Sequence, residues 1–419
     1  MPERPVLPES SASGRAAQID AFLAAAGWGG ARRRPLESDA SFRHYTFLAD
    51  GPRRALLMDA PPEREDVRPY LRIARHLTGL GLSAPHIYAE DAAAGLLVIE
   101  DLGEATYTRL LDRGAGPPSP CPSSSGSAAI AQMPAEPARG EGTLFFAPEH
   151  VTINRDAAPG SPLPSEGEGQ GEGGPARDAG SAGNTLKDQL YALAVDVLID
   201  LHRRPAAESS PPDLPPYDEA ALLREALLFT DWYLPAAARR STDEAVRDDY
   251  IAAWRAVVAP VLAASPTLVL RDYHVDNLLL LQGRSGITAC GLLDFQDALA
   301  GHPAYDLVSL LEDARRDVGD GMAARMRARY TAAFPGQSSS AFAAAYAILG
   351  AQRHMKVLGI FVRLSRRDGK PRYLVHLPRL WRLLQRAVLH PALAPVASWL
   401  ERNVPANLRG GIEHEVAAE

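Results

Sequence analysis

The sequence predicts an α+β fold, with a small sheet-rich N-terminal part followed by a larger and mainly helical part. Between Leu36 and Met58, two β-like runs flank Asp50-Gly51, a pair typical of hairpin turns. Beyond residue 185 the apolar residues recur mostly at helical spacing. Within Thr267–Tyr305, three short apolar runs interrupt this pattern, and polar residues stand only where the runs end.

The N-terminal part is predicted to mix helices and strands. Residues 1–14 are expected to be disordered, and residues 15–103 to form the first structured part. The elements expected within it are a helix at Gln18–Ala26, strands at Arg43–Leu48 and Ala55–Met58, a helix at Val67–Gly79, and strands at Ile87–Tyr88 and Leu96–Ile99. A helix signal follows at Thr106, so Glu100-Asp101-Leu102-Gly103 marks the end of this part.

Residues 114–184 interrupt the helical part, which otherwise extends over residues 104–405. The stretch is rich in Pro, Gly, Ser, Ala and Glu, a composition that buries too little apolar surface to offset the entropy of ordering. We therefore predict a disordered insertion here, and a flexible end at residues 406–419. The predicted helices are one that resumes at Leu186, then Glu219–Trp232, Ala245–Ala259, Tyr305–Glu312, Met322–Ala333, Ala341–Leu358 and a pair within Pro378–Leu400.

Composition and charge argue against several classes of function. The formal net charge of −7 disfavours a general nucleic-acid surface. Two cysteines give no disulfide framework, which favours a reducing cytoplasm. The longest apolar region, Val257–Leu270, contains Pro260 and Pro266 and is too short to span a bilayer, so no membrane partner is expected. The N-terminus carries no apolar signal segment, and the sequence leaves the oligomeric state open.

The polar residues of the central segment have the order and spacing of a phosphotransfer site. Asp272 is followed five residues later by Asn277, and then by a strand, a turn, a strand and Asp294-Phe295. In phosphoryl transfer of the protein-kinase type, the first Asp accepts the proton of the attacking hydroxyl, while the Asn and the second Asp hold Mg²⁺ against the ATP phosphates. We therefore predict Asp272 as the catalytic base, Asn277 and Asp294 as metal ligands, and ATP and Mg²⁺ as cofactors.

Other interpretations of these residues are less favoured. Asp272 and Asn277 could be ordinary turn residues, with Asp294 as a helix cap, but the complete order with a hairpin between them favours the phosphotransfer site. A zinc site at His274 and Asp276 would lack cysteines nearby and a His-Glu helix motif. The absence of a Walker A motif excludes the P-loop kinases.

The same segment resembles the aminoglycoside phosphotransferase and choline kinase-like family. That family has a His-Gly-Asp-x-His-x-x-Asn loop, then Ile-Asp-Trp/Phe-x-x-Ala and Pro-x-Tyr-Asp-Leu. This chain has Asp272, His274 and Asn277, then Leu293-Asp294-Phe295 with Ala298, and Pro303-Ala-Tyr-Asp-Leu307, while Leu270-Arg271 replaces His-Gly. The resemblance implies a bilobal protein kinase-like fold, with a small β-sheet N-lobe and a mainly helical C-lobe.

Within that family the chain is most similar to the bacterial kinases of cell-wall amino sugars. The similar segments are Asp39-Ala-Ser-Phe-Arg43, Met58-Asp-Ala-Pro-Pro62, Glu100-Asp-Leu-Gly103, Arg271-Asp-Tyr-His274, Asp294-Phe-Gln-Asp-Ala298, Tyr305-Asp-Leu-Val-Ser-Leu-Leu311, Gln352-Arg353 and Gly359-Ile-Phe-Val-Arg363. The resemblance implies ATP-dependent phosphorylation of the anomeric hydroxyl of N-acetylmuramate or N-acetylglucosamine in peptidoglycan recycling. A kinase of another small alcohol (an aminoglycoside, choline or homoserine) and a non-catalytic kinase-fold regulator remain alternatives.

The nucleotide site is expected in the N-lobe. The family resemblance assigns Ser38–Phe42, including Ser41, to a lid over the phosphates, and assigns Glu100 and Leu102 to the hinge that meets the adenine. Met58 occupies the place of the usual phosphate-binding lysine, and residues 15–103 contain no lysine. Arg43 is therefore the candidate substitute, because a guanidinium can hold phosphate bidentately. A solvated strand residue is the alternative for Arg43.

Further residues are expected to support the loop or meet the substrate. Arg271, His274 and Asp306 are predicted to support the catalytic loop, with Asp306 acting through hydrogen bonds. Substrate contacts are predicted at Asp297, at Trp232 and Tyr233, whose rings could floor a sugar site, and at Arg363, which could reach an anionic sugar substituent. Plain core packing for the two aromatic residues, and a solvated basic loop at Arg363–Arg372, are the alternatives.

Overall fold

The computed structural model describes residues 9–36, 43–114 and 185–412, and all of these belong to one compact unit. The predicted lid Ser38–Phe42 and nearly all of the predicted insertion lie outside the described residues. So do residues 1–8 of the predicted N-terminal tail and residues 413–419 of the C-terminal one. Within the described ranges, no helix is long and apolar enough to cross a membrane.

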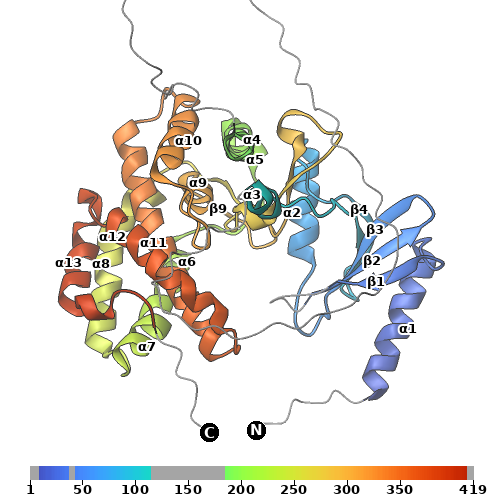
Figure 1. Ribbon diagram of the computed structural model, residues 1–419, viewed down its shortest axis with the longest axis horizontal. Coiled ribbons are helices and arrows are strands. Elements are labelled where there is room, and N and C mark those ends of the chain that lie inside the picture. The colour runs from blue at the N-terminus through green and yellow to red at the C-terminus, as the bar shows by residue number, and fades with distance from the viewer. Residues whose placement is uncertain (1–8, 37–42, 115–184, 413–419) are drawn as a thin grey trace, which may run out of the picture. The chain divides into compact units, whose positions relative to one another are not determined.

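An antiparallel sheet forms the core of the N-terminal part, beside α1 and α2 (Figure 1). Its strand order is β1-β2-β3-β5-β4, with β1 at Arg32–Pro35, β2 at His44–Asp50, β3 at Arg53–Asp59, β4 at Ile87–Asp91 and β5 at Leu96–Ile99. The predicted hairpin is confirmed, since β2 and β3 pair with Asp50 opposite Arg53 and Gly51 adopts φ +57°. Strand β1 was not predicted, because its residues are all exposed and show no apolar alternation.

Residues on the two faces of the sheet pack into two separate cores. Leu48, Leu57 and Val98 face one side and pack with Leu23 and Trp28. Met58, Leu97 and Ile99 alternate with them and belong to the large core that also contains the buried face of α2 (Arg68–Gly79). The second of these faces points toward the rest of the molecule and therefore bears on the site.

Helix α1 extends over Glu9–Ala25, so the prediction of disorder is wrong for Glu9–Gly14. Residues 9–14 contain three Ser and a Gly, which are not strong helix formers, and Arg15 anchors the helix just beyond them. The Arg15 guanidinium donates to Asp59 Oδ1 at 3.1 Å and to the Ala94 carbonyl at 2.8 Å, which ties the helix to the sheet. The predicted helix boundary failed because these contacts come from distant residues.

The C-terminal part is mainly helical and surrounds the long helix α11 (Figure 1). Its helices are α3 Tyr107–Gly114, α4 Leu186–Arg203, α5 Ala206–Ser209, α6 Glu219–Ala226, α7 Leu234–Ala238, α8 Glu244–Leu262, α9 Ala304–Leu311, α10 Asp320–Ala332, α11 Ser339–Arg366, α12 Leu377–Ala387 and α13 Ala394–Asn403. The predicted helix Glu219–Trp232 stops at Ala226 and is followed by a π-helical turn at Phe229–Tyr233. The α+β architecture with a sheet-based N-terminal part is confirmed.

The predicted catalytic segment contains two short antiparallel strand pairs. β7 (Leu278–Leu280) pairs antiparallel with β8 (Cys290–Leu292), which confirms the predicted hairpin. Of the apolar run Ile287–Leu293, only Cys290–Leu292 forms the strand β8, because Gly286–Ala289 forms a 3-10 turn. β6 (Thr267–Val269) pairs with β9 (Leu299–Gly301), a strand too short to show a pattern in the sequence.

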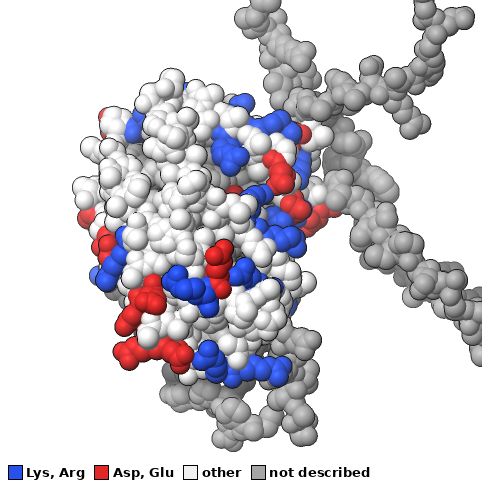
Figure 2. All heavy atoms as spheres, turned by 90° about the vertical axis from the view of Figure 1, so that its left-hand side faces the viewer, with Lys and Arg blue, Asp and Glu red and all other residues white. Residues whose placement is uncertain are grey.

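The C-terminal tail was predicted to be flexible from residue 406, which is wrong for its first part. Ala406–Leu408 forms a 3-10 turn, and the carbonyls of Leu408 and Gly410 accept hydrogen bonds from the buried Tyr233 hydroxyl. On the face shown in Figure 2, basic and acidic side chains are interspersed among uncharged surface, with no extended patch of one sign.

Candidate active site

The loop after β6 is held by a buried carboxylate from α9. Asp306 accepts hydrogen bonds from the backbone N–H groups of Leu270 and Arg271, at 2.6 and 2.8 Å. Burial raises the pKa of Asp306 to about 7, even though both backbone hydrogen bonds favour its ionised form. The structure thus places Asp306 behind the loop, at the position where it supports the backbone of Asp272.

Arg271 adopts a left-handed backbone conformation, with φ of +69°. This conformation is costly for a residue with a side chain, so other contacts must hold it. Its guanidinium pairs with Glu225 and donates to the Asp297 carbonyl at 3.0 Å. Arg271 therefore joins the loop to α6 and to the segment that follows Asp294.

Asn277 connects the two halves of the predicted motif. Its Nδ2 donates to the Asp272 carbonyl at 2.9 Å and lies 3.4 Å from Asp294 Oδ2. The β7–β8 hairpin brings Asp294 back to this point, where its backbone also has a left-handed φ of +57° and Gln296 donates to Oδ1 at 2.7 Å. The structure therefore gathers Asp272, Asn277 and Asp294 at one place.

The surroundings of Asp272 keep its carboxylate ionised. Burial alone would raise its pKa, but Lys356, His274 and Arg353 lie close enough to lower it below the ordinary value. A carboxylate that is ionised at neutral pH can accept a proton, which is the state a general base requires.

Two cavities meet at Asn277 and Asp294, which line both of them. The larger has a volume of about 830 Å³ and includes Asp272. Its other lining residues are His274, Asp276, Ala314, Arg315, Arg353, Lys356, Val357, Ile360, Phe361, Arg372, Tyr373 and His376. The smaller, of about 270 Å³, lies against the sheet and is lined also by Arg43, Tyr45, Leu56, Tyr70, Pro85, Ile99, Glu100, Asp101, Leu102, Gly103, Leu279 and Leu293. We call them the acceptor cavity and the nucleotide cavity.

Arg43 enters the nucleotide cavity just before β2. It is buried, forms an ion pair with Glu65 and lies 5.9 Å from the centre of the Tyr70 ring. Tyr45 and Leu56 line the same cavity, and Met58 shares their face of the sheet because it pairs with Tyr45. An arginine paired with a glutamate thus lines this cavity, while Met58 keeps the place of the usual lysine.

The predicted hinge residues Glu100 and Leu102 also line the nucleotide cavity. Glu100 directly follows β5, and its side chain pairs with Arg284 at 2.5 Å. This contact ties the strand end to the turn between β7 and β8. Ser41, the remaining predicted nucleotide contact, lies outside the described residues.

Helix α11 contributes cations to the acceptor cavity that the sequence analysis did not assign to the site. Arg353 and Lys356 are one turn apart, buried, and reach the cavity that holds Asp272. The available signal was the run Gln352-Arg-His-Met-Lys356 inside an otherwise apolar helix, because buried charged residues are rare without a function. Arg315, Arg372 and His376 complete the basic lining.

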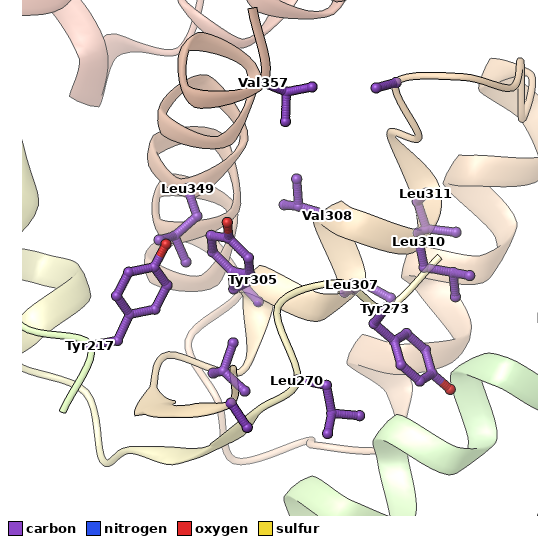
Figure 3. Packing of buried hydrophobic residues seen from close by; sticks show 14 of the residues in the cluster. Tyr217, Leu270, Tyr273, Tyr305, Leu307, Val308, Leu310, Leu311, Leu349 and Val357 are labelled. Atoms are coloured by element: carbon purple, nitrogen blue, oxygen red, sulfur yellow. The ribbon is translucent and has the colours of Figure 1, made fainter. Parts of the chain in front are cut away.

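A buried hydrogen-bond network around Glu225 holds Lys356 and Arg271 in place. Glu225 accepts from Lys356 Nζ at 3.0 Å and from Gln352 at 3.3 Å, and it also contacts Arg271 and the Tyr217 hydroxyl. Figure 3 shows Tyr217 beside Tyr305, whose hydroxyl accepts a hydrogen bond from Lys356 at 3.2 Å. Burial opposes ionisation of Glu225, but Lys356 and Arg271 lower its pKa below the ordinary value.

The structure does not bring the predicted substrate residues to the acceptor cavity. Tyr233 is fully buried among aromatic rings, and its neighbour Trp232 packs against the same core, so the prediction of a sugar floor is replaced by core packing. Both residues belong to the π-helical turn Phe229–Tyr233. Arg363 and the exposed Asp297 are absent from the cavity lining, while His274 lies within it.

Asn277 and Asp294 supply the donor set that Mg²⁺ prefers. Among the described residues no group of three or more His, Cys, Asp or Glu side chains is arranged to hold a metal ion. Mg²⁺ at a phosphotransfer site needs fewer protein ligands, because one or two carboxylate or amide oxygens act together with water and substrate phosphates. Asn277 and Asp294 lie beside each other between the two cavities, with Asn277 Nδ2 3.4 Å from Asp294 Oδ2, and the amide and carboxylate oxygens of this pair would be the ligands.

Comparison with known proteins agrees with this geometry. A profile of the phosphotransferase enzyme family (APH) matches residues 32–122 and 171–342. The chain is 33% identical to the N-acetylmuramate/N-acetylglucosamine kinase of Caulobacter vibrioides, over 95% of this chain and 99% of that protein. It is 32% identical to the Pseudomonas aeruginosa protein of the same name, over 90% of this chain and 91% of that protein.

Among solved structures, choline kinase LicA from Streptococcus pneumoniae has a TM-score of 0.50 at 12% identity, over 90% of this chain and 98% of that chain. At this identity the similarity concerns the fold alone. The matched family profile covers Asp272, Asn277 and Asp294, the residues that the structure gathers between the two cavities. The chain belongs to the phosphotransferase enzyme family (APH) and is an ATP-dependent small-molecule kinase.

Proposed function

We propose that the protein transfers the γ-phosphoryl group of ATP to the anomeric hydroxyl of N-acetylmuramate and N-acetylglucosamine. One observation carries the proposal: Asn277 and Asp294 line both a nucleotide cavity and an acceptor cavity, and Asp272 lies in the second. The relatives at 33% and 32% identity, named for these two sugars, support the substrate class. The proposed physiological role is cell-wall sugar recycling in the cytoplasm, where ATP is available.

In the proposed mechanism each side chain has a separate task. The Asp272 carboxylate orients the sugar hydroxyl and accepts its proton as the oxygen attacks the γ-phosphorus. The bond from that phosphorus to the β,γ-bridging oxygen breaks, and ADP leaves. Asn277 and Asp294 would hold Mg²⁺, which when bound neutralises charge on the phosphates. Arg43, fixed by Glu65, would hold the phosphates from the sheet side.

The acceptor cavity has the surfaces that an amino sugar requires. Val357, Ile360, Phe361 and Tyr373 offer apolar faces for the C–H faces of a pyranose or for an acetyl methyl group. The cations of the lining are Arg315, Arg353, Lys356 and Arg372, and its carboxylates are Asp272, Asp276 and Asp294. The preference for an amino sugar over the cationic alternatives, an aminoglycoside or choline, therefore rests on the relatives named for these sugars. The family membership and the complete base and metal set disfavour a non-catalytic regulator.

The test is a substrate screen with the purified protein. ATP, Mg²⁺ and single acceptors (N-acetylmuramate, N-acetylglucosamine, glucosamine, kanamycin, choline and homoserine) are assayed for ADP release. Phosphorus and proton NMR of the products then locate the phosphate. We expect turnover of the two N-acetyl sugars with phosphate on C1, and none with D272N. Turnover only of a cationic acceptor, or phosphate at C6, would refute the proposal.

A further inference from the structure

Arg353 is a buried cation that is not matched by an acid. It lies in the middle of α11, is 4% exposed, and lines the acceptor cavity. Within the described part of the chain no hydrogen bond or ion pair is formed by its guanidinium, and its Nη1 is buried without a partner. Buried guanidinium groups normally have partners because an isolated charge loses its hydration. Its position therefore requires an explanation.

Several buried acids of this part are engaged by other groups: Asp306 accepts from two backbone N–H groups, Glu312 accepts from His354 and Arg386, and Glu225 is bound by Lys356 and Arg271. The buried Asp313 accepts from the Arg315 backbone N–H through Oδ1, and within the described residues its Oδ2 is buried without a partner rather than bound to Arg353. Asp272 is near enough for Arg353 to lower its pKa, but the two groups do not form an ion pair. The charge of Arg353 is thus left for a group that enters the cavity.

The other cations of the cavity do not share this position. Lys356 is neutralised by Glu225, and Arg315 lies at the exposed rim, near Asp276 and His274. Arg353 is the buried guanidinium of this lining, and within the described residues its Nη1 has no hydrogen-bond partner. A guanidinium presents a planar fork of donors that fits a carboxylate in two parallel bonds.

The location of Arg353 indicates which molecule carries the anion. Arg353 lines the acceptor cavity and is absent from the lining of the nucleotide cavity. The phosphates would approach by way of Asn277 and Asp294, which belong to both. The partner of Arg353 is therefore a group on the acceptor, set apart from the hydroxyl that faces Asp272.

We propose that Arg353 binds the lactyl carboxylate of N-acetylmuramate and so forms a subsite that distinguishes this acid from neutral N-acetylglucosamine. The inference rests on the proposed function. The lactyl ether of that sugar is attached two ring carbons from the anomeric hydroxyl, a separation compatible with Arg353 lying beside Asp272 without pairing with it. N-Acetylglucosamine has only a hydroxyl at that carbon, so it leaves the guanidinium without a counter-charge.

Steady-state kinetics on both sugars test this subsite. For R353Q we expect KM for N-acetylmuramate to rise about 10- to 100-fold, the range for loss of a charge-assisted hydrogen bond. KM for N-acetylglucosamine and kcat for both sugars should stay within about threefold, because Lys356, whose charge lowers the pKa of Asp272 more than that of Arg353 does, remains in place. R353K keeps the positive charge but lacks the planar guanidinium, so its KM for N-acetylmuramate should lie between those of the wild type and R353Q. The matched control R315Q removes a rim guanidinium and should change the ratio of the two KM values by less than threefold.

A change on the substrate side tests the proposal without any variant. The carboxamide of N-acetylmuramate should raise the wild-type KM by a factor similar to that in R353Q. It should lose no further affinity in R353Q itself. If R353Q does not fold, the wild-type KM values for N-acetylmuramate and its carboxamide still test whether the carboxylate is bound.

Three outcomes would overturn the subsite. The first is an equal loss of kcat with both sugars in R353Q, which would assign Arg353 to the transferred phosphoryl group. The second is an unchanged KM for N-acetylmuramate in R353Q. The third is that the wild-type protein has equal KM values for N-acetylmuramate and its carboxamide. Failure of the proposed function is distinct, because the wild-type protein would then phosphorylate neither sugar.

Discussion

Lys356 and Glu225 are 131 residues apart in the sequence, and Lys356 Nζ donates a hydrogen bond of 3.0 Å to Glu225 Oε1 in the protein interior. The same carboxylate contacts Arg271 at the start of the catalytic loop. Helix α6 thereby fixes both a cation of the acceptor cavity and the backbone that precedes Asp272. We infer that Glu225 positions the site without touching substrate.

Loss of the Glu225 charge should destabilise the protein strongly. E225Q leaves Lys356 and Arg271 buried without their counter-charge, a change that typically costs about 3–5 kcal/mol. Urea unfolding followed by circular dichroism measures the difference. E219Q is the control on the same helix: Glu219 pairs with Arg255 at 3.0 Å on the surface, and its loss should cost less than about 1 kcal/mol. Similar effects for both variants would contradict the role given to the network.

Asp272 and Asp294 should fail in different ways when each is replaced by Asn. D272N keeps the shape and removes the proton acceptor, so kcat should fall about 10²–10⁴-fold or more while ATP affinity changes little. D294N removes a proposed metal ligand, so both rate and Mg²⁺-dependent ATP affinity should fall, with partial rescue at high Mg²⁺ or by Mn²⁺. Calorimetric titration with ATP, with and without metal, separates them. The assignment is wrong if D272N alone loses metal-dependent affinity.

Arg43 should contribute to ATP binding more than to sugar binding. It lines the nucleotide cavity and is absent from the lining of the acceptor cavity. We expect R43A to raise KM for ATP about tenfold or more, as for loss of a charge-assisted hydrogen bond, with a small change in KM for sugar. Arg54, exposed on β3, provides the control R54A. An unchanged KM for ATP in R43A would return Arg43 to a purely structural role.

Asp306 should make stability depend on pH in an unusual direction for a carboxylate. Its folded pKa of about 7 is above the ordinary 3.8, so the folded state holds the proton more tightly than the unfolded state. Its stabilising contribution is complete below about pH 3.8 and is lost as pH rises through about 7. The free energy of unfolding should therefore fall with pH in this window by up to about 1.4 kcal/mol per unit relative to D306N.

Urea unfolding of wild-type protein and D306N at several pH values between 4 and 8 measures this difference. Other titrating groups are common to both proteins, so the difference in slope isolates Asp306. An opposite slope would mean that the hydrogen bonds from Leu270 and Arg271 outweigh burial and keep the carboxylate ionised.

The segment between α3 and α4 should be dispensable. The two helices pack against each other, and the family profile skips residues 123–170. Replacing residues 115–184 by a short Gly-Ser linker should leave soluble yield and kcat within about twofold, because loop length changes closure entropy only slowly. A large loss of yield or rate would show that the segment packs or acts.

Local patterns predicted much of the fold. The hairpin at Asp50-Gly51 and the periodic helix at Leu186 depend on neighbouring residues alone, and both are present in the structure. The start of α1 depends on the contact of Arg15 with Asp59, and the position of the C-terminal tail depends on the hydrogen bond from Tyr233 to the Leu408 carbonyl. Neither could be predicted from local sequence.

In the candidate site too, the residues that are close in the sequence were predicted, and those that distant packing brings in were not. Asp272, Asn277 and Asp294 lie within one short segment, and a hairpin is enough to bring them together. Arg353 and Lys356 reach the site because a helix far along the chain packs behind the loop, and helical periodicity alone does not say which neighbour a buried charge will meet. Trp232 and Tyr233 pack into the core instead, and the sequence alone does not tell an aromatic residue that packs in a core from one that lines a sugar site.

The left-handed backbone of Arg271 also bears on how the enzyme matures. Asp306 and Glu225, which hold this conformation, are 35 and 46 residues away in the chain, so the loop cannot take its shape from its own sequence. We infer that during refolding the loop becomes ordered only once α6 and α9 have docked against it. A collapsed intermediate that already contains its helices would be inert as a kinase, and we expect catalytic activity to return later than the helical circular dichroism signal.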